Sequence, residues 1–135
     1  MTRTTLGPVD LGVRPIMAQR ANAHALVSIH LNAQPDGVNP LTNNGTGTYF
    51  FHPHSEPLAR AVQRGMVASM GLTDRGVFYD NLALVRGTWM PSVLCEGAFV
   101  IVPEQEAAMA NPDGQRAYAH GVAAGIEAYF KALGQ

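Results

Sequence analysis

Short apolar runs that alternate with segments of helical periodicity constrain this chain more than any other feature. The runs are rich in the β-branched, aromatic and large aliphatic residues that strands favour, and they are LVSIHLN (26–32), TYFF (48–51) and SVLC (92–95). Apolar residues at the spacing of one buried helix face occur in 11–25, 55–70 and 116–133. Helices interleaved with short strands predict an α/β fold, a three-layer sandwich with a mixed, partly parallel central sheet flanked by helices.

The residues at the ends of these segments predict where the elements begin and end. Asp10 offers a side-chain oxygen to the first free N–H groups of the first helix. Ser55 should cap the second helix in the same way, and Gly71 should end it. The segment 34–47 is rich in Pro, Asn, Gly and Thr, which favours an exposed loop. Residues 1–5 could form one more strand.

The composition excludes several classes of function. Nine Lys and Arg stand against ten Asp and Glu, and Lys131 is the one lysine, so nucleic acid is not an expected partner. The single cysteine, Cys95, excludes an internal disulfide framework and a cysteine-based zinc knuckle. No apolar run approaches the roughly 20 residues of a membrane span, and the first residues lack the order of a signal peptide. We expect a single globular domain over residues 1–135.

Two polar side chains stand at the ends of apolar strands, where open α/β sheets place their functional sites. His30 closes one run and Glu96 closes another. A strand histidine can instead be hydrogen-bonded to its neighbours in a purely structural role, whereas a glutamate is almost never buried without a partner. Asn32 follows His30 by two residues and would share its face of the strand, where it could orient a ligand or cap the turn that follows.

The remaining histidines are weaker candidates. His52 and His54 are two residues apart, so an extended backbone would point both rings the same way as a possible metal pair. Pro53 and the helix that follows favour an exposed loop instead. His24 and His120 lie on predicted helices, where we expect surface or packing roles.

Several longer stretches of the sequence are also similar to a known family. They are SIHLNA (28–33), GTGTYFF (45–51), DRGV (74–77), LALVRGTWMPSVLCEGAF (82–99) and HGVAAGIEAYF (120–130). Their order and spacing resemble the zinc-dependent N-acetylmuramoyl-L-alanine amidases of the amidase-3 class over nearly the whole chain. The most specific pieces are the SIHxN motif and the MPxVLxEGxF run.

The resemblance implies hydrolysis of the amide between the lactyl group of N-acetylmuramic acid and the L-alanine of the stem peptide. His30 matches a zinc-binding histidine of the family, and Glu96 matches its catalytic glutamate. In such enzymes two histidines and a glutamate hold one zinc, which leaves an open position for water. Arg86 could pair with a stem-peptide carboxylate, or it could form an ion pair with Asp80 or Asp74.

The chemistry explains why these residue types are needed. Zinc lowers the pKa of a bound water to about 7, while a nearby carboxylate takes the water's proton and passes it to the leaving amine. Glu96 fits the second role, and its neighbours Cys95 and Phe99 would supply apolar surroundings that raise its pKa.

The family's other two zinc ligands precede the segment that resembles the start of this chain. We therefore expect a domain truncated at its N-terminus, through a fragment or a late start codon, in preference to one that has lost its metal. The alternative function is a non-catalytic peptidoglycan-binding or interaction module. A homodimer that covers the incomplete sheet is expected. The substrate implies the periplasm, cell envelope or exterior, although the sequence carries no visible signal peptide.

Overall fold

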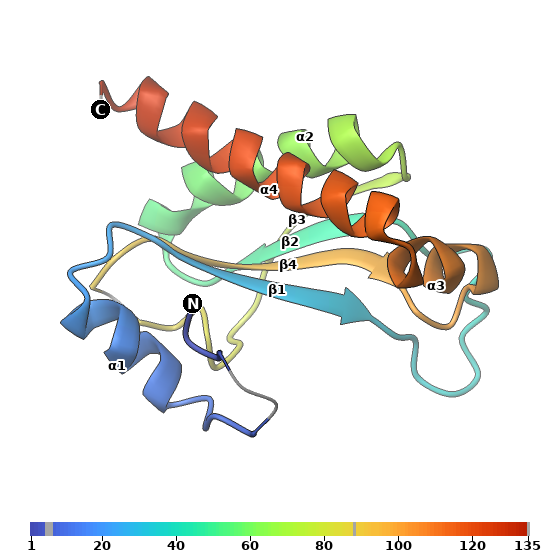
Figure 1. Cartoon of the computed structure of the whole chain (residues 1–135), viewed down its shortest axis with the longest axis horizontal. Helices are drawn as coiled ribbons and strands as arrows, with labels where there is room; N and C mark the ends of the chain where they lie inside the picture. The colour runs from blue at the N-terminus through green and yellow to red at the C-terminus, as the bar shows by residue number, and fades with distance from the viewer. Residues whose placement is uncertain (5–6, 88, 135) are drawn as a thin grey trace.

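The computed structural model describes residues 1–4, 7–87 and 89–134, and a mixed sheet with helices against it forms the framework (Figure 1). In chain order the elements are α1 (Val13–Arg20), β1 (Leu26–Asn32), β2 (Thr46–Phe50), the 3-10 turn η1 (Pro53–Ser55), α2 (Glu56–Met70), β3 (Asp74–Tyr79), β4 (Ser92–Phe99), α3 (Pro103–Ala110) and α4 (Pro112–Ala132).

The strands lie in the order β1-β4-β2-β3. β1 pairs with β4 in parallel, β2 pairs with β3 in parallel, and β2 and β4 are antiparallel. This mixed arrangement confirms the fold class predicted from the sequence. Because β1 and β4 run the same way, their polar carboxyl ends meet at one end of the sheet.

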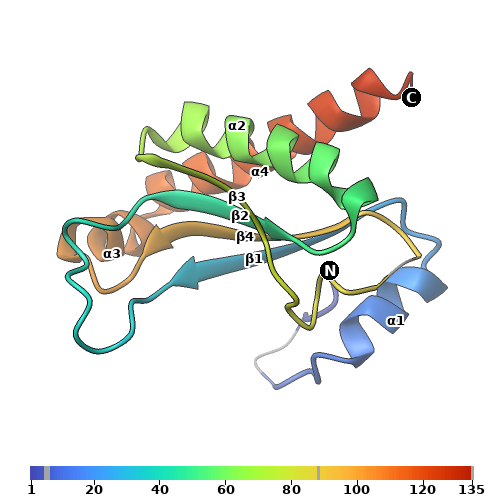
Figure 2. The same ribbon diagram turned by 180° about the vertical axis from the view of Figure 1, so that it is seen from behind.

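The two faces of the sheet carry different elements. α2 and α4 lie side by side on one face, whereas α1 and the N-terminal residues lie on the other side near the start of β1 (Figures 1 and 2). The core fills the space between the sheet and the helix pair, and its most buried members include Leu58, Val62, Met66, Val93 and Cys95. The apolar side of α2 predicted from its spacing is the side that enters this core.

The apolar run 26–32 predicts a buried strand, but β1 is only partly buried. The bounds Leu26–Asn32 agree, but β1 is an edge strand that pairs with β4 alone among the described strands. As a result Ile29 is 56% exposed and Leu31 is 41% exposed. The apolar sequence of β1 correctly predicts a strand, but it does not indicate how many other strands pair with it.

The predicted element ends were right in part. Gly71 ends α2 in the left-handed conformation, with φ of 68°. Ser55 does not cap α2 through its side chain, because its Oγ accepts a hydrogen bond from the Ser92 N–H at 2.9 Å. The first helix stops at Arg20, short of the predicted Ala25, where the chain turns through Asn22 with φ of 50°. Residues 1–4 form no strand, and Thr5 lies outside the described residues.

Candidate functional site

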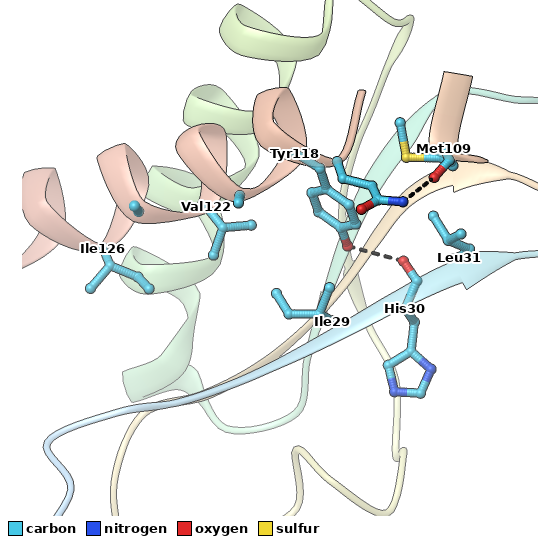
Figure 3. Close-up of a pocket in the computed structure, with 10 residues that line it drawn as sticks. Ile29, His30, Leu31, Met109, Tyr118, Val122 and Ile126 are labelled. Atoms are coloured by element: carbon cyan, nitrogen blue, oxygen red, sulfur yellow. Dashed lines mark hydrogen bonds between the residues drawn. The ribbon is translucent and has the colours of Figure 1, made fainter. Parts of the chain in front are cut away.

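His30 and Glu96 are direct partners in the parallel register of β1 and β4. Side chains at paired positions leave a sheet on the same face, so this register places the imidazole and the carboxylate on one side. Figure 3 shows the His30 ring directed away from α4, whereas Ile29 and Leu31 lie on the α4 side of β1. The candidate site therefore occupies the face opposite the α2–α4 pair.

The His30 ring is half-buried and has a polar neighbour on its own strand. Its Nε2 atom lies 2.9 Å from the hydroxyl oxygen of Ser28, which faces the same side of β1. Burial, followed by the positive charge of Arg14, lowers the pKa of His30 below its ordinary value. A lowered pKa favours the neutral imidazole, which is the form that can bind a metal ion or accept a proton.

The Glu96 carboxyl group is partly buried and holds its proton more tightly than an exposed glutamate does. Burial raises its pKa to about 7, against the opposing effect of the Arg75 positive charge. Its Oε2 atom is buried and has no hydrogen-bond partner within the described part of the chain. A carboxyl group with a pKa near neutrality exchanges protons readily at physiological pH, as a general base must.

Arg75 is a member of the site that sequence reasoning missed. Its guanidinium carbon lies 5.3 Å from the centre of the Phe78 ring and 5.0 Å from that of Phe99. Its Nη1 atom is buried and, among the described residues, has no hydrogen-bond partner. Arg75 belongs to the DRGV stretch that carries part of the resemblance, but nothing local to that stretch indicates that its charge acts on Glu96.

Tyr118 of α4 anchors the two strands of the site from the other face. Its hydroxyl donates toward the carbonyl oxygens of His30 and Cys95, each 3.0 Å away, and the contact with His30 is drawn in Figure 3. Burial raises the pKa of Tyr118, so the hydroxyl stays protonated as this contact requires. Gly97 leaves room for the ring, because a Cβ atom there would lie 2.5 Å from it.

The structure does not bring the other two candidate residues into equally direct contact with this pair. The Asn32 side-chain oxygen accepts a hydrogen bond from the Ala33 N–H at 2.8 Å, as a turn cap does. Arg86 is exposed on the loop after β3, and its carbonyl oxygen lies 2.8 Å from Nε2 of His52. Because His52 follows the end of β2, which is antiparallel to β4, Arg86 lies toward the opposite end of the sheet from Glu96.

The remaining sequence candidates behave as structural residues. The rings of His52 and His54 stack with their centres 5.5 Å apart and nearly parallel, so they do not converge on a point. Within the described residues, neither Asp74 nor Asp80 forms an ion pair with Arg86, whose Nη2 atom instead donates to the Asn81 carbonyl at 3.1 Å.

A separate apolar groove of about 600 Å³ lies between the exposed edge of β1 and α4. Its lining includes Ile29, Leu31, Met109, Val122 and Ile126 (Figure 3). The groove lies on the α4 side of the sheet, so the His30 ring points away from it. It is thus a packing surface beside the candidate site and not part of it.

The model of the Amidase_3 family, described as N-acetylmuramoyl-L-alanine amidase, matches residues 1–128. The chain belongs to this amidase family. Two solved structures of such amidases are similar in fold. The catalytic domain of CwlV from Bacillus (Paenibacillus) polymyxa var. colistinus superposes with a TM-score of 0.87 at 34% identity, covering 96% of this chain and 70% of CwlV. The amidase of Clostridium difficile 630 gives a TM-score of 0.88 at 32% identity, covering 96% and 70%.

A curated relative extends the comparison to a longer protein. An uncharacterized cell wall amidase of Bacillus anthracis is 31% identical over 132 residues, covering 90% of this chain but 24% of its own length. The chain therefore spans about a quarter of that relative, and it spans 59% of a second relative, the uncharacterized protein YqiI of Bacillus subtilis.

Proposed function

We propose that this chain carries the catalytic glutamate of a peptidoglycan hydrolase that cleaves the amide between N-acetylmuramic acid and L-alanine. The observation that carries the proposal is the pairing of His30 and Glu96 on one face of the sheet. Membership of the amidase family supports the reaction class. In this proposal Asn32 orients the substrate at the end of β1, and Arg86 contacts substrate farther along the sheet.

Glu96 acts as the general base. Its carboxylate takes a proton from the attacking water and returns it to the departing amine of L-alanine. Partial burial supports this role, because a pKa raised to about 7 leaves both the carboxylate and the acid populated near neutral pH. The neutral His30 ring beside it is a second polar group of the site, held by Ser28.

The residues that the structure describes do not by themselves fit a zinc ion. They contain no group of three or more His, Cys, Asp or Glu side chains able to hold a metal. We propose zinc as the cofactor with His30 as one ligand, and the other ligands then come from outside these residues, in a domain extended at its N-terminal side. When bound, zinc would polarise the scissile carbonyl and activate water. The 70% coverage of the CwlV domain is compatible with such additional residues.

The decisive experiment replaces Glu96 with glutamine in the zinc-binding full-length protein. We expect release of stem peptides from muropeptides to fall by about 100-fold or more, because general-base catalysis contributes on this scale. The exposed Glu106 on α3 gives a matched control, and Glu106→Gln should keep the parent rate. A Glu96→Gln protein that turns over as fast as the parent would remove Glu96 from the mechanism.

A non-catalytic role is the second candidate, favoured by the absence of a metal-binding group among the described residues. In that case the chain binds peptidoglycan through the same face without metal. Calorimetry with muropeptides distinguishes the two functions, because EDTA should leave binding to a metal-free module unchanged. Loss of binding on addition of EDTA would exclude it.

We also propose that two copies of the chain associate through β1. An edge strand offers unpaired backbone groups, and the groove beside it presents apolar side chains that include the exposed Ile29 and Leu31. Ile29→Lys should yield a monomer in light scattering, while Ile101→Lys, at another exposed isoleucine after β4, should not. A stable parent protein that is strictly monomeric would contradict the dimer.

The proposed substrate places the protein in the cell envelope or outside the cell. A relative named as a cell wall amidase supports this location. Among the described residues, no helix is both long and apolar enough to cross a membrane.

A further inference from the structure

Arg75 lies on the side of the sheet where the alternation of β3 does not predict it. Side chains two residues apart in a regular strand leave the sheet on the same side. Val77 packs against the core under α2 and α4, so a regular strand would direct Arg75 into that core as well. The guanidinium carbon of Arg75 instead lies 5.3 Å from the centre of the Phe78 ring and 5.0 Å from that of Phe99. Phe78 adjoins Val77, so a local feature of β3 must turn Arg75 to the opposite face.

The Phe78 ring lies beside Glu96 on that opposite face. Gly47 of β2 is the register partner of both Glu96 in β4 and Gly76 in β3. A Cβ atom at Gly47 would lie 3.1 Å from the Phe78 ring, so the ring covers the bare position next to Glu96. The guanidinium that lies over this ring is thus placed near the candidate base. Burial raises the pKa of Glu96 and the charge of Arg75 opposes this effect, as such a placement requires.

An irregularity in the pairing of β2 with β3 explains the direction of Arg75. Thr46 pairs with Asp74 and Gly47 pairs with Gly76, so Arg75 is an extra residue with no partner in β2. Such a bulge interrupts the alternation of side chains and re-aims the residue that it contains. Gly76, directly after it, has φ of 90°, a conformation that residues with a Cβ atom rarely adopt.

The Asp74 carboxylate holds this bulge in place. Its Oδ1 atom accepts hydrogen bonds from the Gly76 N–H at 2.8 Å and from Nε2 of Gln63 at 2.6 Å. The same Gln63 nitrogen also donates to the Thr46 carbonyl at 2.8 Å. Gln63 is a buried residue of α2, so the bulge is fixed from the side of the sheet that the helices cover.

We propose that Asp74 is a positioning residue of the hydrolase, which together with Gln63 holds the β3 bulge that presents the Arg75 guanidinium to Glu96. This inference rests on the proposed function and deepens it. Nη1 of Arg75 and Oε2 of Glu96 are both buried, and neither has a hydrogen-bond partner within the described part of the chain. Because unlike charges attract, a guanidinium kept in place by two rings restricts the orientation of the nearby carboxylate. Asp74 acts through Arg75 and not on the substrate.

The position of the Arg75 side chain can be measured without catalysis. Because its guanidinium lies over two rings, the side-chain signals of Arg75 should carry ring-current shifts in the NMR spectrum of the full chain. Gly76→Ala should remove these shifts, since a new Cβ atom meets nothing within 4 Å and disturbs only the backbone conformation. Gly71→Ala is the matched control, because Gly71 ends α2 with φ of 68° and a Cβ atom there also meets nothing within 4 Å.

Substitutions of Asp74 test the side chain that closes the bulge. Asp74→Ala removes the acceptor and should abolish the ring-current shifts of Arg75, whereas Asp74→Asn keeps an acceptor oxygen and should retain them. Asp80→Ala is the control, because Asp80 accepts only a local hydrogen bond from the Asn81 N–H. Unaltered Arg75 signals in both Asp74→Ala and Gly76→Ala would refute the proposal.

Hydrolysis of muropeptides by the zinc-binding full-length protein tests whether this position matters for the reaction. Asp74→Ala should lower kcat by about threefold and leave KM unchanged, because it disturbs the chemical step and not substrate binding. In an Arg75→Met background the same substitution should lower kcat no further, since Asp74 acts through Arg75. An unchanged kcat, a rise in KM alone, or an equal further fall in the Arg75→Met background would overturn the positioning role.

The outcome can be separated from that of the proposed function. The ring-current shifts report the position of Arg75 whether or not the protein is a hydrolase. If they depend on Asp74 but Glu96→Gln hydrolyses muropeptides at the parent rate, the presentation of Arg75 by the bulge stands and the catalytic assignment of Glu96 fails. If hydrolysis depends on Glu96 but Asp74→Ala changes neither the shifts nor kcat, only the positioning role fails.

Discussion

The two faces of the sheet differ in how their polar groups are satisfied. On the face under α2, the buried Gln63 donates to the Thr46 carbonyl at 2.8 Å, and Thr48 donates to Gln63 at 2.8 Å. On the opposite face, Glu96 and Arg75 each bury a polar atom that has no partner among the described residues. Buried polar groups are almost always paired in proteins, so the two unpaired ones distinguish the face that carries the candidate site from the well-satisfied face under α2.

The side of the sheet that α2 and α4 cover is also packed more tightly than the opposite side. α2 and α4 approach so closely that a Cβ atom at Gly125 would lie 2.4 Å from the Cα of Val62. A side chain at Gly121 would come within 2.7 Å of the Cα of Met66. The glycines thus allow the two helix backbones to touch. The exposed edge of β1, by contrast, borders a cavity of about 210 Å³ that is lined by Arg14 and Ser28.

The largest effect is expected where the tight face is disturbed. Gly125→Leu places a branched side chain against the backbone of α2, and we expect a loss of about 3 kcal/mol or more in the free energy of unfolding. Urea denaturation measures it. Ala124→Ser on the exposed side of α4 is the control, with a change below about 0.5 kcal/mol. A Gly125→Leu protein as stable as the parent would show that the helices can separate cheaply.

A smaller effect is expected where the two faces are linked. Tyr118→Phe removes the hydroxyl that reaches the carbonyl oxygens of His30 and Cys95, and we expect a loss of about 1–2 kcal/mol in unfolding free energy. Amide signals of His30 and its neighbours should shift in the NMR spectrum, because the strand ends are no longer held. Tyr79→Phe at a residue that is 68% exposed should do neither. Unchanged amide signals near His30 would argue that α4 does not position the site.

The sequence predicted the elements of the site better than it predicted their surroundings. β1 was predicted with its observed bounds, because an apolar run ending in polar residues is a local signal. That His30 and Glu96 adjoin follows from parallel pairing of two strands that the pattern had already indicated. The mixed α/β sheet is confirmed for the same reason.

The contacts that tune the site could not be found in this way. Tyr118 is 88 residues from His30, and it sits on an amphipathic helix among other half-apolar positions. Arg75 lies in β3, which is not adjacent to β4 in the sheet, and its charge acts on Glu96 because its long side chain extends over the rings of Phe78 and Phe99. Both depend on the order of strands and the choice of rotamer, for which a single sequence holds no local signal.

Ionisation of the Glu96 carboxyl group should lower the free energy of unfolding in a pH-dependent way. Burial raises the pKa of Glu96 from its ordinary value to about 7, so the folded state binds this proton more tightly than the unfolded state does. Stability from this group is therefore full below about pH 4.5 and is lost as the pH rises toward 7. Glu96→Gln should be more stable than the parent by about 1 kcal/mol at pH 8, after allowance for solvent screening, and equal to it at pH 4. An advantage of equal size at both pH values would exclude titration of Glu96 as its cause.

The smallest effect is expected from the positive charge beside this carboxyl group. Arg75→Met keeps an apolar side chain between the rings of Phe78 and Phe99 but removes the charge that lowers the pKa of Glu96. The pKa of Glu96 should rise above about 7, as followed by carbon-13 NMR of its carboxyl group. If Glu96 is the base, hydrolysis at pH 7 should fall by about threefold and recover at pH 9, since less carboxylate is then present at neutrality. Arg64→Met on the exposed side of α2 should change neither quantity. If Arg75→Met leaves the titration of Glu96 unaltered, the guanidinium serves only to pack against the rings of Phe78 and Phe99. The difference in polar pairing between the two faces of the sheet would then depend on Glu96 alone.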